Sequence, residues 1–309
     1  MKMSKNKEKK FRVSYYKTFN EPATKTIIYV VLIGIGYAYL YPLLYMITSS
    51  FMSVEDLVNP TVVWIPTKLT LDNFVRAWKV LEMPKALWNS VYTSVIPALA
   101  QSLITALIAY GLSRFEFPLK RFWIVLMLAT FLIPTQVTLV TKYVLFSTLR
   151  LTDSIFATFL PAIFGQGIRS AIFILLYLNF FNMLPKAFDE AAEIDGANTF
   201  QIFYKIILPL SLPAIVTTFI FSLVWYWNET LLSGLLLGNK IKTLPLELRD
   251  FVVRYAVMFP TADGSAANRI NEGIRMAATM ITILPLLITY LFLQRQFVES
   301  LERTGITGE

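Results

Sequence analysis

The chain contains no cysteine and no histidine among its 309 residues, and only 16% of its residues are charged. The missing cysteines exclude disulfides and thiol catalysis. Without histidine as well, the common zinc sites and the usual proton shuttle at neutral pH are also excluded. Soluble domains average about 45–50% apolar and about 25% charged residues, whereas 56% of this chain is hydrophobic. Composition alone therefore predicts a membrane protein.

The net charge of +8 does not indicate nucleic-acid binding, because eight of the 28 basic residues lie within the first 25 positions. A basic segment beside a membrane span is a topology signal and a contact for anionic lipid. The hydrophobic run from Ile27 to Met46 has 20 residues, which exceeds the roughly 7–15 of a signal-peptide core. We interpret residues 1–26 as a basic cytoplasmic segment and the run as a retained first span.

Six hydrophobic stretches have the length needed to cross about 30 Å of hydrocarbon, which takes about 20 residues. They cover approximately residues 27–49, 87–112, 121–141, 155–181, 209–229 and 274–294. Each contains an internal proline, namely Pro42, Pro97, Pro134, Pro161, Pro213 and Pro285. Proline removes a backbone hydrogen bond and kinks a helix, which neighbouring helices compensate in a bundle. The sequence thus predicts an all-α integral membrane protein with six transmembrane helices within residues 27–294.

Lysine and arginine near the span ends predict the orientation. The basic N-terminal segment and the loop carrying Arg114, Lys120 and Arg121 are both expected on the cytoplasmic side. The loop between spans five and six is an exception, with six basic residues from Lys240 to Arg275 on the predicted outer side. Because this loop is about 45 residues long and also contains acids, we give it little weight. Both termini, including the tail 295–309, are then cytoplasmic.

A polar, acidic stretch interrupts this hydrophobic chain between spans four and five. It runs Glu190-Ala191-Ala192-Glu193-Ile194-Asp195-Gly196 and is followed by Ile206, Leu208 and Pro209. Residues 186–208 are predicted to form two short helices, with Pro185 at a first helical position and Gly196 at a sharp turn of positive φ. Asn198 is expected to cap the second helix in a capping box with Gln201. Phe200, Phe203 and Ile207 recur at helical spacing as an apolar stripe.

One interpretation of this stretch is an amphipathic connector lying on the lipid headgroups. Acidic residues on an otherwise basic cytoplasmic side argue against it, because anionic lipid repels them. The spacing E-A-A-x3-G-x9-I-x-L-P instead resembles the cytoplasmic loop by which permease subunits of bacterial ABC importers engage their ATPase. The match fixes seven positions and the gaps between them.

Further residues are similar to the smaller six-span permease of maltose-type carbohydrate importers. They include Gly167-Ile168-Arg169-Ser170, Leu184-Pro185, Trp225-Tyr226-Trp227-Asn228-Glu229, Leu244-Pro245, Met276-Ala277-Ala278 and Phe297-Val298-Glu299-Ser300-Leu301. The ending Gly305-Ile306-Thr307-Gly308 is similar to a tail that reaches into the ATPase dimer in relatives. Glu302-Arg303 departs from the small residues usual before that tail.

The resemblance implies the type I ABC importer transmembrane architecture, with a loop at about 184–209 that couples to the ATPase. The ATPase-coupling residues are then Glu190, Ala191, Ala192, Asp195, Gly196, Ile206, Leu208 and Pro209, with Gly305 and Gly308 as tail contacts. It further implies a related second permease as a heterodimer partner, two copies of an ABC ATPase and an extracytoplasmic solute-binding protein. This chain would bind no cofactor or metal itself, and the partner ATPase would use ATP and Mg²⁺. The location implied is the cell membrane.

Two other classes compete with this hypothesis. An ion-coupled secondary transporter usually keeps ionisable groups deep inside its spans, whereas here only Arg169 lies well within one and Glu229 and Arg275 lie near ends. A membrane-embedded enzyme needs a nucleophile–base set or a metal cluster, for which this chain lacks the residues. The chain also has no G-x4-G-K-[ST] loop. If transport uses ATP, another subunit must hydrolyse it.

The outer end of span five offers the candidate substrate path. Trp225, Asn228 and Glu229 combine an aromatic ring, an amide and a carboxylate, which suits sugar faces and hydroxyls. An aromatic belt at the membrane surface explains the same residues, and phenylalanine also simply fills membrane helices. The assignment to a sugar or oligosaccharide therefore rests on the resemblance, and another small polar solute remains an alternative.

Overall fold

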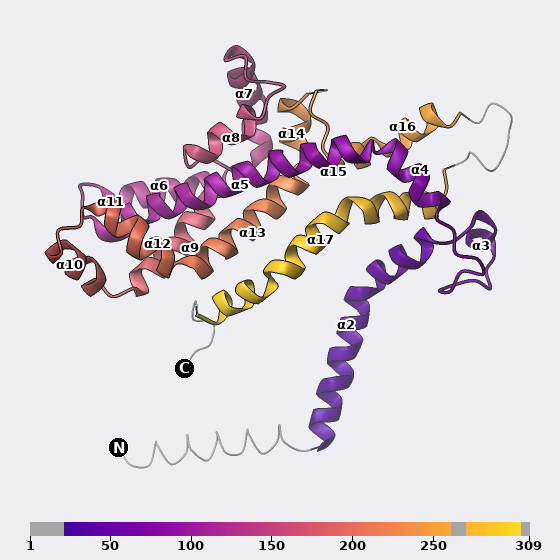
Figure 1. Cartoon of the computed structure of the whole chain (residues 1–309), viewed down its shortest axis with the longest axis horizontal. Helices are drawn as coiled ribbons and strands as arrows, with labels where there is room; N and C mark the ends of the chain where they lie inside the picture. The colour runs from indigo at the N-terminus through magenta and orange to yellow at the C-terminus, as the bar shows by residue number, and fades with distance from the viewer. Residues whose placement is uncertain (1–21, 239, 261–269, 304–309) are drawn as a thin grey trace. The chain divides into compact units, whose positions relative to one another are not determined.

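The computed structural model describes residues 22–238, 240–260 and 270–303, with side chains described as far as residue 295 (Figure 1). These residues form helices joined by turns and loops, and the described part of the chain contains no strand. The chain divides into two units, which are described separately. One comprises Met1–Val75 with Asn271–Met280, and the other comprises Arg76–Ile270 with Ile281–Glu309.

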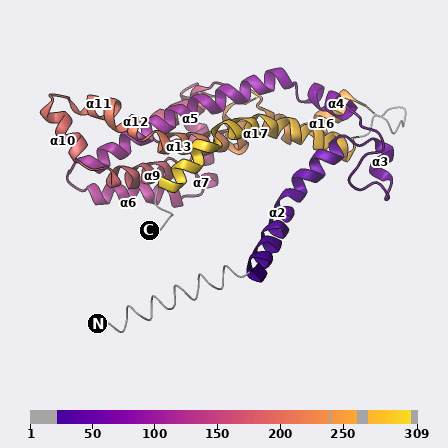
Figure 2. The same ribbon diagram turned by 60° about the horizontal axis from the view of Figure 1, so that its bottom comes forward.

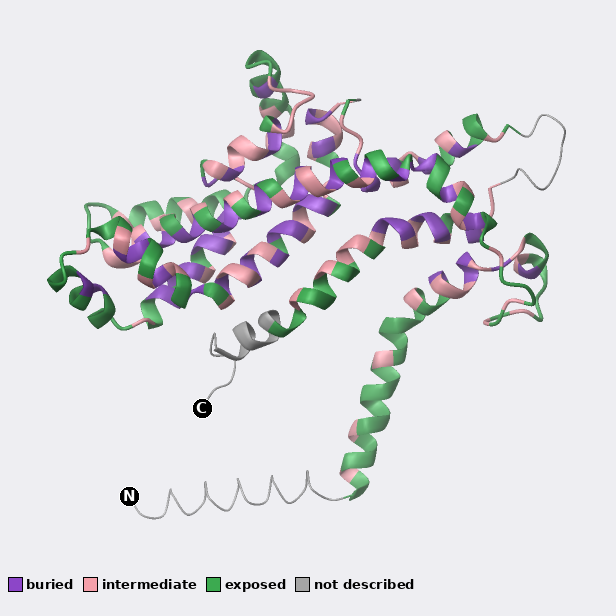
Figure 3. Cartoon of the chain, in the orientation of Figure 1, coloured by how far each residue is buried: buried purple, intermediate pink, exposed green. Residues whose placement is uncertain are grey.

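The first unit is dominated by the long helix α2 (Pro22–Ser50), which contains Pro42. Its 29 residues are about 44 Å long, enough to cross a bilayer. Its large apolar side chains are exposed along most of its length (Figure 3), as expected of a span that faces lipid. Only near its end do Met46, Ser49 and Ser50 become buried.

The far end of α2 is fixed by hydrogen bonds within the same unit. The Asn73 side-chain amide donates to the backbone carbonyls of Ser50 and Met52, at 3.0 and 2.8 Å. Asn73 lies at the start of α4 (Asp72–Val80), and the short helix α3 (Val54–Val58) lies between α2 and α4. Ser53 caps α3 by accepting a hydrogen bond from the Asp56 backbone N–H.

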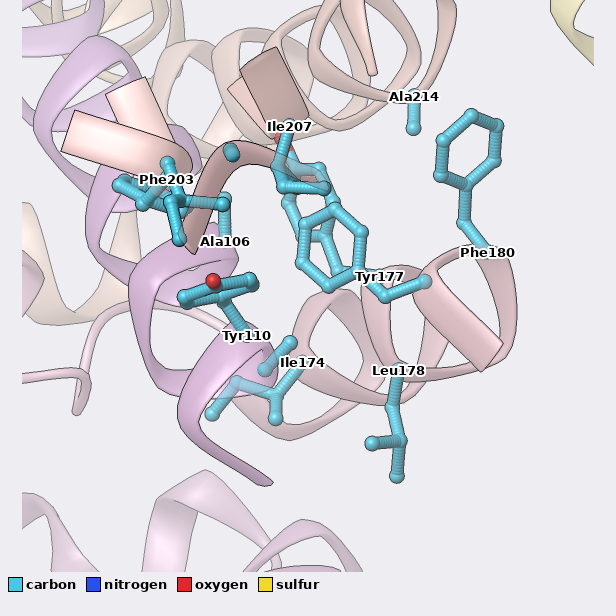
Figure 4. Packing of buried hydrophobic residues seen from close by; sticks show 13 residues of the cluster. Ala106, Tyr110, Ile174, Tyr177, Leu178, Phe180, Phe203, Ile207 and Ala214 are labelled. Atoms are coloured by element: carbon cyan, nitrogen blue, oxygen red, sulfur yellow. The ribbon is translucent and has the colours of Figure 1, made fainter. Parts of the chain in front are cut away.

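The second unit is built around α5 (Met83–Arg114), which packs against α13 (Leu212–Asn228), α9 (Ser170–Met183) and α8 (Phe156–Ile163). Small residues on α5 permit this close packing: Ala98, Ala106 and Ala109 are fully buried. Figure 4 shows the part of the core where Tyr110 lies beside Phe203, with ring centroids 5.1 Å apart. The Tyr177 and Thr218 hydroxyls form a 2.5 Å hydrogen bond between α9 and α13.

Three helices are long and apolar enough to cross a membrane as single rods: α2, α5 and the Glu272–Arg295 part of α17 (Glu272–Arg303). Three bent helix pairs raise the number of candidate spans to as many as six, if each pair is one span. The predicted all-α class and the predicted number of spans are therefore confirmed. Pro97 and Pro285 lie inside α5 and α17, as expected.

The third and fourth predicted spans are not continuous helices. The stretch 121–141 is split between α6 (Lys120–Leu132) and α7 (Thr135–Thr148), which meet at 96° with Pro134 at the break. The stretch 155–181 is split by residues 164–169, between α8 and α9. In the fifth, Pro213 is the second residue of α13, just after the 79° bend that follows Leu210. It causes no kink inside α13, because the first helical turn needs no N–H from it.

Three short helices follow α13: α14 (Leu231–Leu236), α15 (Leu244–Arg249) and α16 (Phe251–Met258). Arg254 of α16 links α15 to the start of α5 through contacts of 2.6 Å to both Glu247 and Glu82. Burial raises the pKa of the Glu247 carboxyl, against the opposing effect of the Arg254 charge. This ion-pair network holds the end of α5 that lies opposite the acidic stretch.

Candidate functional site

Residues 184–209, here called the acidic segment, leave the bundle as a helical pair with a turn between. After Met183 the chain bends by 74° into α10 (Ala187–Ile194). It then turns back through α11 (Thr199–Ile202), the π-helix η1 (Phe203–Ile207) and α12 (Leu208–Leu210). In Figures 1 and 2 alike, α10 lies at the extremity of the bundle, with α11 beside it.

Gly196 makes the turn between α10 and α11. Its φ is +83°, and its N–H donates to the Glu193 carbonyl at 3.0 Å. Residues with a Cβ are strained in this conformation. A Cβ built on Gly196 meets no atom within 4 Å, so the requirement for glycine comes from the backbone and not from crowding. The predicted positive-φ turn is confirmed.

Asn198 caps α11 as predicted. Its side-chain oxygen accepts from the Gln201 backbone N–H at 3.0 Å, and the Gln201 side chain accepts from the Asn198 N–H at 2.8 Å. Pro185, in contrast, lies just before the helix and not at its first position, since Lys186 is the N-cap of α10. The second helix of the acidic segment is therefore fixed locally by its own capping box.

Replacing Asn198 with alanine should loosen this helix. Loss of such a cap costs about 1 kcal/mol, which corresponds to roughly a fivefold rise in local opening. Amide hydrogen exchange of residues 199–203 in the purified complex should accelerate by that factor. The exposed neighbour Thr199, changed to alanine, is the matched control. Equal exchange in the Asn198 variant and the wild type would show that packing alone holds α11.

The acidic segment is anchored to α5 by a buried ion pair. The Arg114 Nε and Asp189 Oδ2 lie 3.0 Å apart, with side chains only 8% and 13% exposed. The Tyr110 hydroxyl donates to the other oxygen, Asp189 Oδ1, at 3.0 Å. Arg114 also donates from Nη1 to the Phe181 carbonyl at 3.2 Å and from Nη2 to the Leu184 carbonyl at 3.4 Å. One arginine thus joins the ends of α5 and α9 to the first turn of α10.

Sequence reasoning missed this anchor. From the sequence alone, Asp189 is a favourable charge at the N-terminal end of a helix, and Arg114 is a topology signal beside a span. The charge type and position of each residue were visible, but their pairing spans 75 positions of sequence. Tyr110 carried no signal at all, because a tyrosine on an apolar helix normally fills the core. Signals at helix ends concern neighbouring residues only, so they could not have predicted that Arg114, Asp189 and Tyr110 are in contact.

The predicted coupling residues divide into an outward and an inward set. Glu190, Ala191, Asp195, Gly196 and Pro209 are exposed, whereas Ala192 is buried and Ile206 and Leu208 are partly buried against the core of Figure 4. The first set offers an acidic surface with a small residue at its centre. The second set attaches that surface to the bundle.

The predicted apolar stripe is wrong at one position. Phe203 and Ile207 are buried, but Phe200 is 71% exposed. The reason is that the chain passes from α11 into the π-helix η1 after Ile202; the change in helical pitch turns later residues inward. Three other large apolar side chains of the acidic segment, Phe188, Ile194 and Tyr204, are also exposed.

The candidate path residues lie at the other end of α13. The Trp225 ring stacks on Phe173 with centroids 5.0 Å apart, and the Arg169 guanidinium lies 4.8 Å from its centroid. Asn228 is exposed, and its amide donates to the Val224 carbonyl at 2.9 Å. The Glu229 Oε1 accepts from the Leu231 and Leu232 N–H groups, at 2.8 Å each. Glu229 therefore caps α14 and is not simply an unpaired acid.

Two predicted elements lie outside the described residues. These are the basic segment as far as residue 21 and the tail contacts Gly305 and Gly308. The described residues contain no cluster of acidic residues suited to a metal ion. The site that the geometry defines is therefore the exposed surface of α10 and α11, carried on a bundle of membrane spans.

A helical membrane bundle that projects an exposed acidic helix pair has the form of the membrane component of a transport system driven by a separate subunit. Comparison with known proteins gives the family. The chain belongs to the binding-protein-dependent transport system inner membrane components, whose pattern matches residues 102–303. It is accordingly a multi-pass membrane protein and a permease component of an ABC transporter, not its ATPase.

Individual relatives match most of the chain. It is 31% identical over 285 residues to the polygalacturonan/rhamnogalacturonan transport system permease protein YtcP of Bacillus subtilis (strain 168), covering 91% of this chain and 97% of YtcP. It is 30% identical to the probable ABC transporter permease protein YurM of the same organism, covering 92% and 89%. It is 29% identical to the arabinooligosaccharides transport system permease protein AraQ of Halalkalibacterium halodurans, covering 90% and 96%.

Solved structures share the fold, and one of them covers nearly the whole chain. A chain from a bacterial ABC transporter involved in the import of the acidic polysaccharide alginate superposes with a TM-score of 0.70. The match covers 90% of this chain and 99% of the other at 22% sequence identity. It confirms the predicted type I importer architecture.

Proposed function

We propose that this chain is the membrane-spanning permease subunit of an ATP-driven importer that moves a sugar or oligosaccharide into the cytoplasm. The observation that carries this proposal is the acidic segment, an exposed helix pair held to the bundle by the Arg114–Asp189 pair. Relatives named for polygalacturonan, arabinooligosaccharides, diacetylchitobiose and starch products support the carbohydrate assignment. Another small polar solute is the alternative.

In this proposal, ATP binding draws two ATPase subunits together, and the acidic segment transmits that motion to the spans. Glu190 and Asp195 pair with basic residues of the ATPase, and the exposed Phe200 and Ile194 enter an apolar cleft on it. The ATPase uses ATP and Mg²⁺. The buried attachment of Ala192, Ile206 and Leu208 makes α10 and α11 move with α9 and α13 as one body. A binding protein delivers the sugar on the outer side.

Deleting the gene tests the proposal in the cell. The deletion strain should lose ATP-dependent uptake of at least one oligosaccharide, and the wild-type gene supplied on a plasmid should restore it. A Glu190→Lys copy should restore far less, since it places a repulsive charge at the ATPase contact. The matched control Glu116→Lys changes an exposed acid outside the acidic segment. Undiminished uptake of all oligosaccharides in the deletion strain would refute the proposal.

We further propose that the chain works as a heterodimer with a related permease. A half-pathway lined by α5, α9 and α13 needs a second half to enclose a solute. The chain expressed alone should be unstable or inactive, and co-expression with the neighbouring permease gene should yield a stable complex. Size-exclusion chromatography with multi-angle light scattering measures this. A monodisperse homo-oligomer that transports sugar with only the ATPase present would contradict it.

Glu229 is proposed to lie near the outer mouth of the path, facing the interior of the heterodimer. A carboxylate at this depth is costly against lipid and far less so beside water, and the two backbone N–H groups of α14 stabilise its charge. Glu229→Gln should lower uptake severalfold with little change in complex yield, and Asn228→Ala should also lower it. Uptake equal to wild type in both variants would rule out this placement.

A further inference from the structure

The predicted fourth span, residues 155–181, is interrupted by a stretch without helix. Helix α8 ends at Ile163 and α9 begins at Ser170. Between them Gly165 and Arg169 have positive φ, +69° and +55°. Since α9 has 14 residues, Arg169 lies about 21 Å from Met183 at the other end of that helix, which places it in the outer third of a hydrocarbon layer of about 30 Å. Irregular backbone at this depth is found where it is buried in protein or lines a water-filled cavity.

Arg169 places a positive charge in this break. The residue is exposed, and its guanidinium stacks over the Trp225 ring, which itself stacks on Phe173. Among the residues that the structure describes, the Arg169 side chain has neither an acidic partner nor a hydrogen-bond acceptor. Stacking occupies the face of the guanidinium and leaves its N–H edge available, and that edge matches a carboxylate in a bidentate pair.

The end of α9 adds to this positive field. Arg169 is the N-cap of α9, and the first turn of the helix contains no acidic residue. The helix dipole therefore presents its positive end at the break. Half-helix N-termini inside transporters bind anionic groups of solutes in this way.

Buried polar atoms without partners face the same break. The Gln101 side-chain oxygen is fully buried and accepts no hydrogen bond from the described residues, while its nitrogen donates to the Ile168 carbonyl at 2.7 Å. A Cβ on Gly167 would collide with that oxygen and with the Tyr226 hydroxyl. The Ser170 hydroxyl is likewise buried and unpartnered within the described part of the chain. Such atoms are normally satisfied by water or by a ligand.

A purely structural role for Arg169 fits these observations poorly. Structural arginines of this chain are saturated by protein acceptors: Arg114 contacts a carboxylate and two carbonyls, and Arg254 contacts two carboxylates and a carbonyl. Arg169 has only an aromatic face.

We propose that residues 164–170 and Trp225 form an anion-recognising subsite in the translocation path, and that the imported sugar carries carboxylates, as uronic-acid oligosaccharides do. Arg169 would bind a carboxylate with its N–H edge, while Gln101 Oε1 would accept from a sugar hydroxyl. This inference rests on the proposed function and narrows its substrate class.

The absence of native cysteine allows a direct test. Phe164, 73% exposed in the break, is changed to cysteine in the complex with its partner permease and ATPase, held in phosphatidylcholine nanodiscs. The introduced thiol is modified with a negatively charged and, separately, a positively charged methanethiosulfonate. The two modification rates of this subunit are then compared. With Arg169 present, the anionic reagent should react faster than the cationic one. Arg169→Gln should lower the ratio of the anionic to the cationic rate roughly tenfold. The control Arg121→Gln, at an exposed arginine of α6, should leave it within about twofold.

Ligand protection identifies the anion. Trigalacturonate should slow modification of the Phe164→Cys thiol, whereas the neutral α-1,4-linked trisaccharide maltotriose should not. The protection by trigalacturonate should vanish in Arg169→Gln. Absence of any modification, a ratio insensitive to Arg169, or equal protection by maltotriose would overturn the inference. The protection measurement is repeated in nanodiscs that also contain phosphatidylglycerol. Protection by this lipid, with none by trigalacturonate, would overturn the inference in favour of a lipid ligand. None of these results touches the proposed function, which fails separately if ATP drives uptake of no oligosaccharide.

Discussion

Replacing Arg114 with alanine is expected to destabilise the attachment of α10 by about 3–5 kcal/mol, because the buried Asp189 carboxylate loses its counter-charge. The same change removes both hydrogen bonds to the end of α9. We therefore expect the ATPase to dissociate during purification and ATP-driven uptake to fall at least a hundredfold, as about 3 kcal/mol implies. Co-purification of the ATPase and uptake in proteoliposomes measure the two effects.

Two further variants separate the ion pair from general damage. Tyr110→Phe removes only one hydrogen bond to Asp189 and should cost about 0.5–1.5 kcal/mol. In an Arg114→Gln background, Asp189→Asn should restore part of the lost assembly, since no unpaired charge then remains. If Arg114→Ala retained full ATPase binding and uptake, the ion pair would not be the anchor.

Replacing Gly196 with valine is the second change of large expected effect. A β-branched residue at a φ of +83° costs about 1–3 kcal/mol of backbone strain, and the chain relieves that strain by shifting α10 against α11. The surface offered to the ATPase then changes shape. We expect transport-coupled ATP hydrolysis to fall about tenfold or more, with ATPase activity of the separate subunit unchanged.

Gly196→Asn is the matched control, because asparagine tolerates the left-handed region better than other residues with a Cβ. A Cβ at this position has open space around it, so the valine and asparagine variants differ in backbone preference more than in packing. The asparagine variant should keep most of the coupled activity. Wild-type assembly together with wild-type coupled ATPase activity in Gly196→Val would refute the account of this turn.

The parts of the fold that depend on local composition were predictable. Hydrophobic length alone located α2, α5 and α17, since a membrane span requires about 20 apolar residues whatever surrounds it. The turn at Gly196 and the cap at Asn198 were also predicted, because both depend on neighbours within three positions. Such features are encoded by adjacent residues and need no knowledge of the tertiary structure.

The breaks in spans three and four were not predictable in the same way. Pro134 ends α6 and forces a 96° bend, whereas Pro97 remains inside a continuous α5. The two prolines look alike in sequence, and only the packing around them differs. Hydrophobicity does not predict the position of a break either, because a bent span and a straight span contain similar apolar side chains.

Long-range partners limited the prediction of the site as well. Asp189 binds Arg114 across 75 residues, so its local interpretation as a helix-end charge missed its main contact. Arg169 was visible as the one charge well within a span, but its stacking on Trp225 joins two helices distant in sequence. In both cases the residue type indicated a special role, but the sequence did not identify the residue that it contacts.

In the proposed function, the chain transports an oligosaccharide by engaging an ATPase through the acidic segment. Its most direct test is uptake into proteoliposomes containing this chain, the neighbouring permease and the ATPase, with the binding protein and sugar outside. The account predicts accumulation only with ATP and Mg²⁺ inside, abolished by a hydrolysis-deficient ATPase and unaffected by ionophores. Uptake that persisted without the ATPase and followed an imposed proton or sodium gradient would contradict it.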